Sequence, residues 1–175
     1  MTMRKFVLAA ALLATAHAQA ALQIGAPAPV FTTEAAVGGQ AFKFDLKTEL
    51  KKGPVVLYFY PKAYTQGCTA EAHDFAEATP QFKALGATVV GMSNDNIDTL
   101  KKFSVEECRN KFAVAADEGA KMIKAYDVSL VIKPYMADRV SFLIGQDGKI
   151  AAVHSAMDPS GHVKAMLEAV KALKK

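Results

Sequence analysis

The chain has few cysteines, no internal repeat and little excess charge. Its 175 residues include 2 cysteines, 11 glycines and 7 prolines, and 51% of them are apolar. These proportions exclude a disulfide-dense mini-protein, a collagen-like repeat and a disordered tail. At one domain per roughly 100 to 200 residues, the length predicts a single domain that is large enough to bury a core.

Motifs for nucleotides, nucleic acids and metals are also missing. No Walker-type loop and no Gly-x-Gly-x-x-Gly segment follows a predicted strand, so we expect no nucleotide or flavin cofactor. Lys and Arg residues do not cluster beyond pairs before the end of the chain, which argues against nucleic-acid binding. The histidines after residue 20, which are His73, His154 and His162, lack metal-like spacing, so no metal site is expected.

Residues 1–20 have the layout of a secretory signal peptide. Arg4 and Lys5 precede a run rich in Ala, Leu and Val over 6–16, and small residues follow at A-x-A spacing. The run is far shorter than the roughly 20 residues that span a bilayer. We expect cleavage of 1–20 on export to the bacterial periplasm, which leaves a domain over 21–175 without stable membrane insertion. Loss of Arg4 and Lys5 from 21 basic residues leaves 19 against 17 acidic residues, a net charge of +2.

Export affects the interpretation of the two cysteines, Cys68 and Cys108. In an oxidising compartment, a pair of cysteines usually forms a structural disulfide. Such a bond would close a loop of about 40 residues, which the chain-entropy model values at roughly 4 kcal/mol. The other interpretation is that one or both cysteines are reactive, and the count alone leaves both interpretations open.

Predicted strands and helices alternate along residues 21–175. An extended entry segment at 22–31 contains two prolines. We predict strands at 41–46, 55–60, 87–92, 112–116, 139–144 and 150–154, and helices at 65–85 with a kink or break at Pro80, at 96–112 and at 119–126. A last helix to 173 begins at Asp158-Pro159 or has Ser160 as its cap. The strand at 55–60 is apolar throughout, as expected for a central strand that is buried on both faces. The order predicts an α/β fold whose mixed central sheet carries helices on both faces.

Two of the predicted helices carry apolar stripes that should face the core. In the helix at 96–112 the stripe consists of Ile97, Leu100, Val105, Cys108 and Phe112. In the C-terminal helix it consists of Val163, Met166, Leu167, Val170 and Leu173.

Cys68 lies where chemistry is expected in such a fold. The chain leaves the buried strand at Tyr60, turns at Pro61, and enters a helix for which Thr65 is the candidate N-cap. Cys68 would then occupy the first helical turn, where unpaired N–H groups and the helix dipole favour a thiolate. A nucleophilic cysteine reacts as a thiolate, and ligands of open α/β sheets bind at the carboxyl ends of the strands.

The segment Pro61-x-x-x-Thr65-x-x-Cys68 resembles the active-site motif of the peroxiredoxins, and Tyr58-Phe59-Tyr60 resembles the buried strand before it. Residues 25–31 are similar to the Gly-x-x-Ala-Pro-x-Phe segment of that family. Residues 139–144 and 147–150 resemble its arginine-bearing strand and hairpin. The resemblance covers nearly all of 21–175 and is closest to the Q-type, or bacterioferritin comigratory protein, subfamily. It implies a thioredoxin fold and a thiol-dependent peroxidase that reduces hydrogen peroxide and organic hydroperoxides.

The resemblance also implies a role for each matching residue. Cys68 would be the peroxidatic cysteine, which attacks a peroxide oxygen and becomes a sulfenic acid. Thr65, Arg139 and the backbone N–H of Cys68 would donate hydrogen bonds to the peroxide oxygens. Pro61 would keep water from the sulfur, and Glu71 would orient Arg139. Each residue also has an ordinary structural interpretation when it is taken singly. Pro61 could end a strand and Thr65 could cap a helix. Arg139 could lie on the surface, and Glu71 could be a first-turn acid that complements the helix dipole.

For Cys108 the resemblance suggests the resolving role. One Q-type subset has its resolving cysteine five positions after the peroxidatic one, where this chain has His73. Another subset has it on the helix after the second strand of the α/β core, where Cys108 lies. An intramolecular disulfide would then need local unwinding. The alternatives are an inert buried cysteine, or a single-cysteine enzyme that an external thiol rescues.

Two other functions compete with the peroxidase. A thiol-disulfide oxidoreductase of the same fold normally uses Cys-x-x-Cys, but the residue three after Cys68 is Glu71. A non-catalytic domain would use Cys68 and Cys108 only as a structural disulfide. For the peroxidase we expect a thioredoxin-like or other thiol reductant as partner and a monomeric chain.

Overall fold

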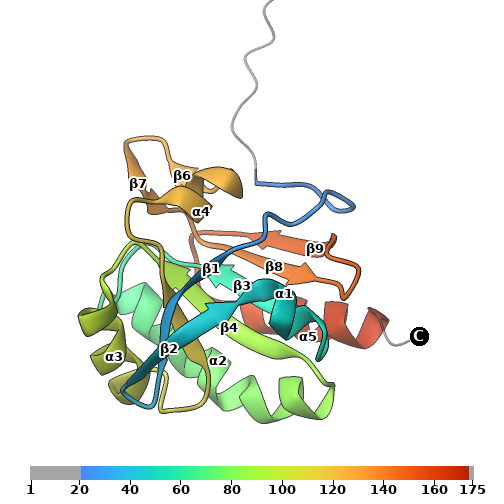
Figure 1. Ribbon diagram of the computed structural model, residues 1–175, viewed down its shortest axis with the longest axis horizontal. Helices are drawn as coiled ribbons and strands as arrows, with labels where there is room; N and C mark the ends of the chain where they lie inside the picture. The colour runs from blue at the N-terminus through green and yellow to red at the C-terminus, as the bar shows by residue number, and fades with distance from the viewer. Residues whose placement is uncertain (1–20, 174–175) are drawn as a thin grey trace, which may run out of the picture.

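The structure is a computed structural model that describes residues 21–173 (Figure 1). The predicted signal peptide at 1–20 lies outside the described residues. Seven strands form one mixed sheet in the order β2-β1-β5-β4-β3-β8-β9. Their bounds are β1 Thr32–Val37, β2 Gln40–Asp45, β3 Val55–Phe59, β4 Thr88–Ser93, β5 Ala113–Ala116, β8 Val140–Ile144 and β9 Ile150–Ser155. The predicted α/β fold with a mixed central sheet is confirmed.

Five helices surround this sheet in the described part of the chain. They are α1 Leu46–Leu50, α2 Gln66–Ala84, α3 Ile97–Glu106, α4 Lys121–Ala125 and α5 His162–Leu173. A second, two-stranded sheet of β6 Ser129–Leu130 and β7 Lys133–Ala137 stands above one end of the main sheet in Figure 1. Across residues 21–173, no helix has both the length and the apolar character needed to cross a membrane.

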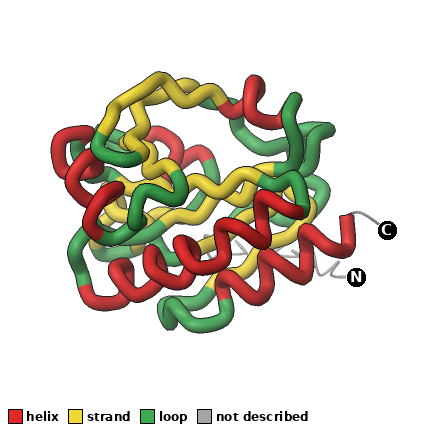
Figure 2. The backbone as a smooth tube through the Cα atoms, turned by 90° about the horizontal axis from the view of Figure 1, so that it is seen from below, coloured by secondary structure: helices red, strands yellow, loops and turns green. Residues whose placement is uncertain are grey.

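The central strand β3 separates two hydrophobic cores, because its side chains alternate between the two faces of the sheet. Val56 and Tyr58 join a core with the buried residues of α2, α3 and α5. Val55, Leu57 and Phe59 join a second core with the buried residues of α1 and α4. Helices therefore cover both faces, and α2 and α5 lie side by side on the first face (Figure 2).

Strand pairing places the end of β3 beside the start of β8. β3 runs parallel to β4 and antiparallel to β8, with Phe59 opposite Val140. The chain that leaves β3 toward α2 therefore begins next to Arg139, the residue just before β8. The sheet in this way brings together two segments that are far apart in the sequence.

Of the predicted kink or break at Pro80, the break does not occur, because α2 continues through Pro80 to Ala84. A proline inside a helix removes one backbone N–H and its hydrogen bond. Phe75 before it and Phe82 after it are both buried in the first core, so packing on both sides holds the helix together.

The predicted helix at 96–112 is too long, and Cys108 does not lie on it. α3 ends at Glu106, and the chain then turns through Arg109 and Asn110, which have φ of 51° and 59°. Such left-handed residues end a helix, and asparagine tolerates this conformation better than most residues. The predicted core position of Val105 is also wrong, since its side chain is 42% exposed.

The sequence prediction missed β1, α1 and the β6–β7 sheet. It also began the last helix at Asp158-Pro159 or with Ser160 as its cap, whereas α5 starts at His162. In that helix Met166 and Val170 are buried as expected, whereas Leu173 is exposed.

Candidate active site

Cys68 lies in the first turn of α2, directly after the loop that leaves β3. Its side chain is 1% exposed. The loop is held by Asp95, whose Oδ2 accepts hydrogen bonds from the Ala63 backbone N–H and from Ser93 Oγ, each at 2.8 Å. The sequence analysis missed Asp95, because no motif marks it. The end of β4 thus fixes the position at which α2 begins.

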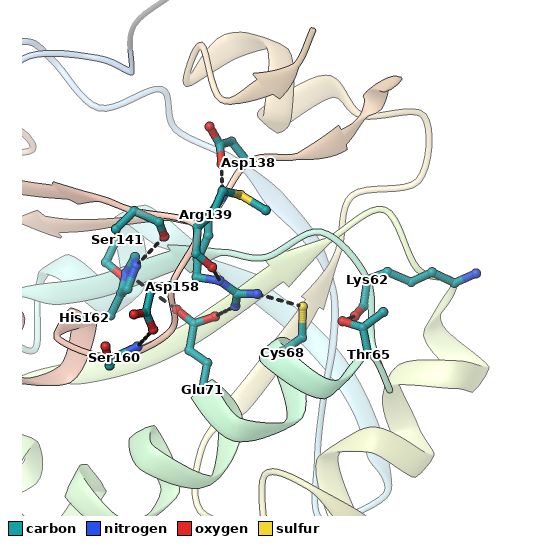
Figure 3. Close-up of polar contacts among 12 residues, drawn as sticks. Lys62, Thr65, Cys68, Glu71, Asp138, Arg139, Ser141, Asp158, Ser160 and His162 are labelled. Carbon is teal, nitrogen blue, oxygen red and sulfur yellow. Dashed lines mark hydrogen bonds and ion pairs between the residues drawn. The ribbon is translucent and has the colours of Figure 1, made fainter. Parts of the chain in front are cut away.

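Arg139 contacts Cys68 with a guanidinium group that is almost fully buried. Its Nη2 donates to Cys68 Sγ at 3.5 Å, its Nη1 donates to Glu71 Oε2, and its Nε donates to the Met157 carbonyl at 2.9 Å (Figure 3). The residue as a whole is 3% exposed. Each guanidinium nitrogen therefore has a partner, and the cation is fixed beside the sulfur in one orientation.

Gly67 leaves the space that the guanidinium occupies. A Cβ atom at this position would lie 2.9 Å from Arg139 Nη2. Contacts this short essentially never occur for real Cβ atoms, so either Arg139 or the helix turn would have to move. The glycine before Cys68 therefore allows the arginine to reach the sulfur.

Glu71, one turn after Cys68 on α2, is fully buried. One carboxylate oxygen accepts from Arg139, and the other, Oε1, has no hydrogen-bond partner among the described residues. Burial raises the pKa of Glu71 to about 8, although the nearby Arg139 lowers it. Burial therefore favours the protonated form of this carboxyl group, and the guanidinium opposes that effect.

Thr65 and Pro61 flank the loop before α2. Thr65 occupies the N-cap position, but its side chain makes no capping hydrogen bond and instead donates Oγ1–H to the Lys62 carbonyl at 3.0 Å. The hydrogen of this hydroxyl is thus already used, so in this state Thr65 can offer a ligand an acceptor and not the expected donor. Pro61 is half-buried at the end of the β3 strand.

Cys108 is a free thiol in the same hydrophobic core as Cys68, which is also free. It is fully buried, and this burial raises the pKa of its thiol well above the ordinary range. Burial raises the pKa of the Tyr58 and Tyr60 phenol groups. Both phenols also lie near the two sulfurs, and a negative charge on either sulfur would raise the pKa of these tyrosines further. The two cysteines are therefore neighbours of one buried aromatic pair.

Three polar contacts tie the Cys108 segment to α2 and the loop before it, and we call them the Cys108 clamp. They are Tyr64 Oη to Glu106 Oε2 at 2.7 Å, His73 Nε2 to Glu107 Oε2 at 2.6 Å, and Arg109 Nη1 to Glu77 Oε1 at 3.1 Å. All six side chains are partly or largely exposed to solvent. The clamp thus holds in place the segment that carries the buried Cys108 thiol.

The sequence analysis treated the histidines as scattered, but His154 and His162 pack together, and His162 lies beside Glu71. The rings of His154 and His162 meet edge to face, with centroids 4.5 Å apart. His162 Nδ1 lies 3.6 Å from Glu71 Oε1. No group of three or more side chains suited to a metal ion occurs in the part of the chain that the structure describes. Only the pairing of β8 with β9 and the start of α5 bring these histidines to the site, so no local signal could have placed them there.

Comparisons with known proteins agree with this geometry. Residues 24–153 match the AhpC/TSA family. Peroxiredoxin Bcp of Escherichia coli K12 is 34% identical over 129 residues, which are 71% of this chain and 82% of the relative. The chloroplastic peroxiredoxin Q of Sedum lineare is 31% identical over 128 residues, which are 73% and 68% of the two chains.

The fold is likewise that of a solved relative. The crystal structure of peroxidoxin BcpB from Mycobacterium tuberculosis is 28% identical with a TM-score of 0.79, and the match covers 88% of this chain and 99% of that one. The expected thioredoxin-like fold is thus confirmed. The chain belongs to the AhpC/TSA family, within the Q/Bcp peroxiredoxins, and is a thiol-dependent peroxidase.

Proposed function

We propose that Cys68 is the peroxidatic cysteine and that its substrates are hydrogen peroxide and organic hydroperoxides. The observation that carries this proposal is the hydrogen bond from the fixed Arg139 guanidinium to Cys68 Sγ. The thiolate attacks the terminal peroxide oxygen, the S–O bond forms as the O–O bond breaks, and Cys68 becomes a sulfenic acid. The leaving oxygen takes up a proton and departs as water or an alcohol.

The surrounding residues would hold the peroxide in line with the sulfur. Arg139 and the Cys68 backbone N–H donate to the peroxide oxygens, where negative charge develops. Thr65 accepts from the terminal O–H, because its own hydrogen is bound to the Lys62 carbonyl. Pro61 limits access of water, and Glu71 positions Arg139 through its ion pair.

Cys108 is the proposed resolving cysteine. Its sulfur attacks the sulfenic sulfur of Cys68, an S–S bond forms, and water leaves. Because Cys108 is fully buried, the clamp must open and the first turn of α2 must unwind before the sulfurs meet. A thioredoxin-like or other dithiol then reduces the disulfide and restores both thiols.

We further propose export to the periplasm and a monomeric active form. The support for export is the basic, apolar and A-x-A pattern of residues 1–20. The reductant would then be an exported protein. Mass analysis of the protein from a periplasmic extract should find its N-terminus after Ala18 or Ala20, and retention of Met1 would contradict export.

The first prediction concerns the oxidised product. Reduced protein that receives one equivalent of hydrogen peroxide should lose two hydrogens, with a peptide map that joins Cys68 to Cys108. Cys108→Ser should instead gain oxygen on Cys68, and Cys68→Ser should not react. Added oxygen on Cys68 of the wild-type protein, with Cys108 free, would mean that an external thiol resolves it. Two untouched thiols would exclude Cys68 as the peroxidatic residue.

The second prediction tests the contact between Arg139 and Cys68. Gly67→Ala places a methyl group against Arg139 Nη2 and should lower the second-order rate constant with hydrogen peroxide about 10-fold or more, as expected for a displaced transition-state donor. Gln66→Ala is the matched control, because this exposed neighbour lies in the same helical turn. Stopped-flow kinetics measure both variants, and thermal unfolding reports whether they fold. A folded Gly67→Ala variant with the rate constant of the wild type would show that the contact is dispensable.

The third prediction concerns the Cys108 clamp. Glu107→Ala removes the contact with His73 and should speed disulfide formation roughly 5-fold, since one lost hydrogen bond of about 1 kcal/mol populates the open segment. Asp98→Ala is the control, because it removes an exposed ion pair with Lys101 within α3 that does not reach α2. Rapid-quench mass spectrometry follows both steps. Slower disulfide formation with an unchanged first step would mean that the clamp assists closure.

A further inference from the structure

A cavity of about 220 Å³ opens at the end of the main sheet opposite Cys68. Thr88 and Val89, at the start of β4, and Ala113, at the start of β5, line part of it. The loop before α2 is instead fixed at the other end of β4, through Asp95. The proposed reaction with peroxide uses none of the residues that line this cavity, so the cavity is separate from the active site.

The walls of the cavity are mostly apolar and carry three aromatic rings. Phe44 and Phe112 are buried, and Phe42 is 40% exposed. The Phe42 and Phe44 rings meet edge to face, with centroids 6.5 Å apart. A further ring between such walls can make the offset or edge-on contacts that aromatic groups prefer. The volume lies below the roughly 300 to 1,000 Å³ of sites for drug-sized ligands, so the cavity suits one ring with a short side chain.

Two lysines and one glutamate supply the charges at the cavity. Lys83, in the last turn of α2, and Lys111, before β5, are both exposed. Neither ammonium group has an acidic partner among residues 21–173. Glu49 also lines the cavity, but its Oε1 is paired with Lys52 at 2.7 Å. The remaining positive charge favours an anionic ligand, whose carboxylate lies toward the lysines and whose ring lies among the phenylalanines.

The cavity also touches the segment that must move before Cys108 can react. Lys111 donates its backbone N–H to the Cys108 carbonyl at 2.9 Å. Phe112, the next residue, packs edge to face against Tyr58 and Phe75 of the first core. One wall of the cavity is therefore the direct continuation of the turn that carries Cys108. A ligand that contacts Lys111 and Phe112 stabilises the closed turn, because opening of the turn would disturb these contacts.

We propose that this cavity binds a small aromatic carboxylate and that the bound ligand keeps the Cys108 turn closed. The ligand then slows formation of the disulfide between Cys68 and Cys108 and leaves the reaction of Cys68 with peroxide unchanged. Because the turn is displaced once the disulfide has formed, the oxidised protein should bind the ligand more weakly. The effect on the disulfide rests on the proposed roles of the two cysteines, whereas binding in the cavity does not.

Binding is tested with 3-phenylpropanoate and the reduced protein. Nitrogen-15 NMR should show saturable shifts at the amides around the cavity, with a dissociation constant of about 1 mM or less, as expected for a ligand of this size. The probe 3-phenylpropylammonium has the same ring and the opposite charge, and it should not bind. Absence of saturable shifts with 3-phenylpropanoate, or equal affinity for the two probes, overturns the proposal.

Single variants locate the bound probe. Lys111→Gln and Lys83→Gln each remove one cation and should each weaken binding of 3-phenylpropanoate about 5-fold, the effect of one exposed ion pair. Phe42→Ala removes a partly exposed ring of the wall and should weaken binding by a similar factor. Lys43→Gln is the matched control, because Lys43 is exposed on β2 but does not line the cavity. Unchanged affinity in both folded lysine variants of the cavity would overturn the proposal, and thermal unfolding shows whether they fold.

The effect on Cys108 is measured by rapid-quench mass spectrometry after one equivalent of hydrogen peroxide. Saturating 3-phenylpropanoate should slow disulfide formation about 5-fold, while the Cys68 thiol is oxidised at an unchanged rate. At the same probe concentration Lys111→Gln should show little of this slowing. A rate of disulfide formation that does not change at saturation overturns the proposal. Wild-type protein that forms no disulfide even without the probe would instead refute the proposed role of Cys108 and leave the binding result intact, so the two failures are distinguishable.

Discussion

A buried arginine next to a buried cysteine is the constraint on which the rest of the site depends. A guanidinium that is 3% exposed has lost its water and needs a partner at each nitrogen. The Met157 carbonyl supplies one of these partners from the loop before α5, and Cys68 and Glu71 supply the other two from the first turns of α2. The glycine at position 67, the register of β8 against β3 and the loop before α5 together make the site that this one group occupies.

The same constraint creates competition for charge. Two groups that can be anionic, Cys68 and Glu71, share one cation inside the protein, where the interaction between charges is strong. An ionised Glu71 would hold Arg139 in position, but it would also compete with the Cys68 thiolate for the positive charge of the guanidinium. Burial of Glu71 reduces this competition, because it raises the pKa of the carboxyl group and so opposes its ionisation. The carboxyl group accepts a hydrogen bond from Nη1 in either protonation state, so it orients Arg139 in both.

The sequence predicted those parts of the site that depend on local spacing. Pro61, Thr65 and Cys68 lie within eight residues, and the resemblance to a known family added Arg139 and Glu71. Asp95 and His162 could not be found in this way, because pairing between strands and the start of α5 bring them to the site. The end of α3 was missed for a different reason. Its helical pattern continues to Phe112, but the chain turns at Arg109, a residue type that does not normally adopt a left-handed conformation. Strands β6 and β7 are short and largely exposed, so they lack the apolar alternation that marks a strand.

In the proposed cycle Cys108 is buried in the reduced protein and must become accessible to the Cys68 sulfenic acid after the reaction with peroxide. A cysteine on the body of α3 could meet the first requirement, but its release would break several helical hydrogen bonds. Cys108 instead lies two residues beyond the helix, in a turn with two left-handed residues and with contacts between side chains that solvent already reaches. Segments of this kind open at much lower free energy than the core, because exposed polar contacts contribute little and left-handed residues are strained. The place where the sequence pattern and the structure disagree, the last turn of the expected helix, is therefore also the place where the proposed cycle requires the fold to open.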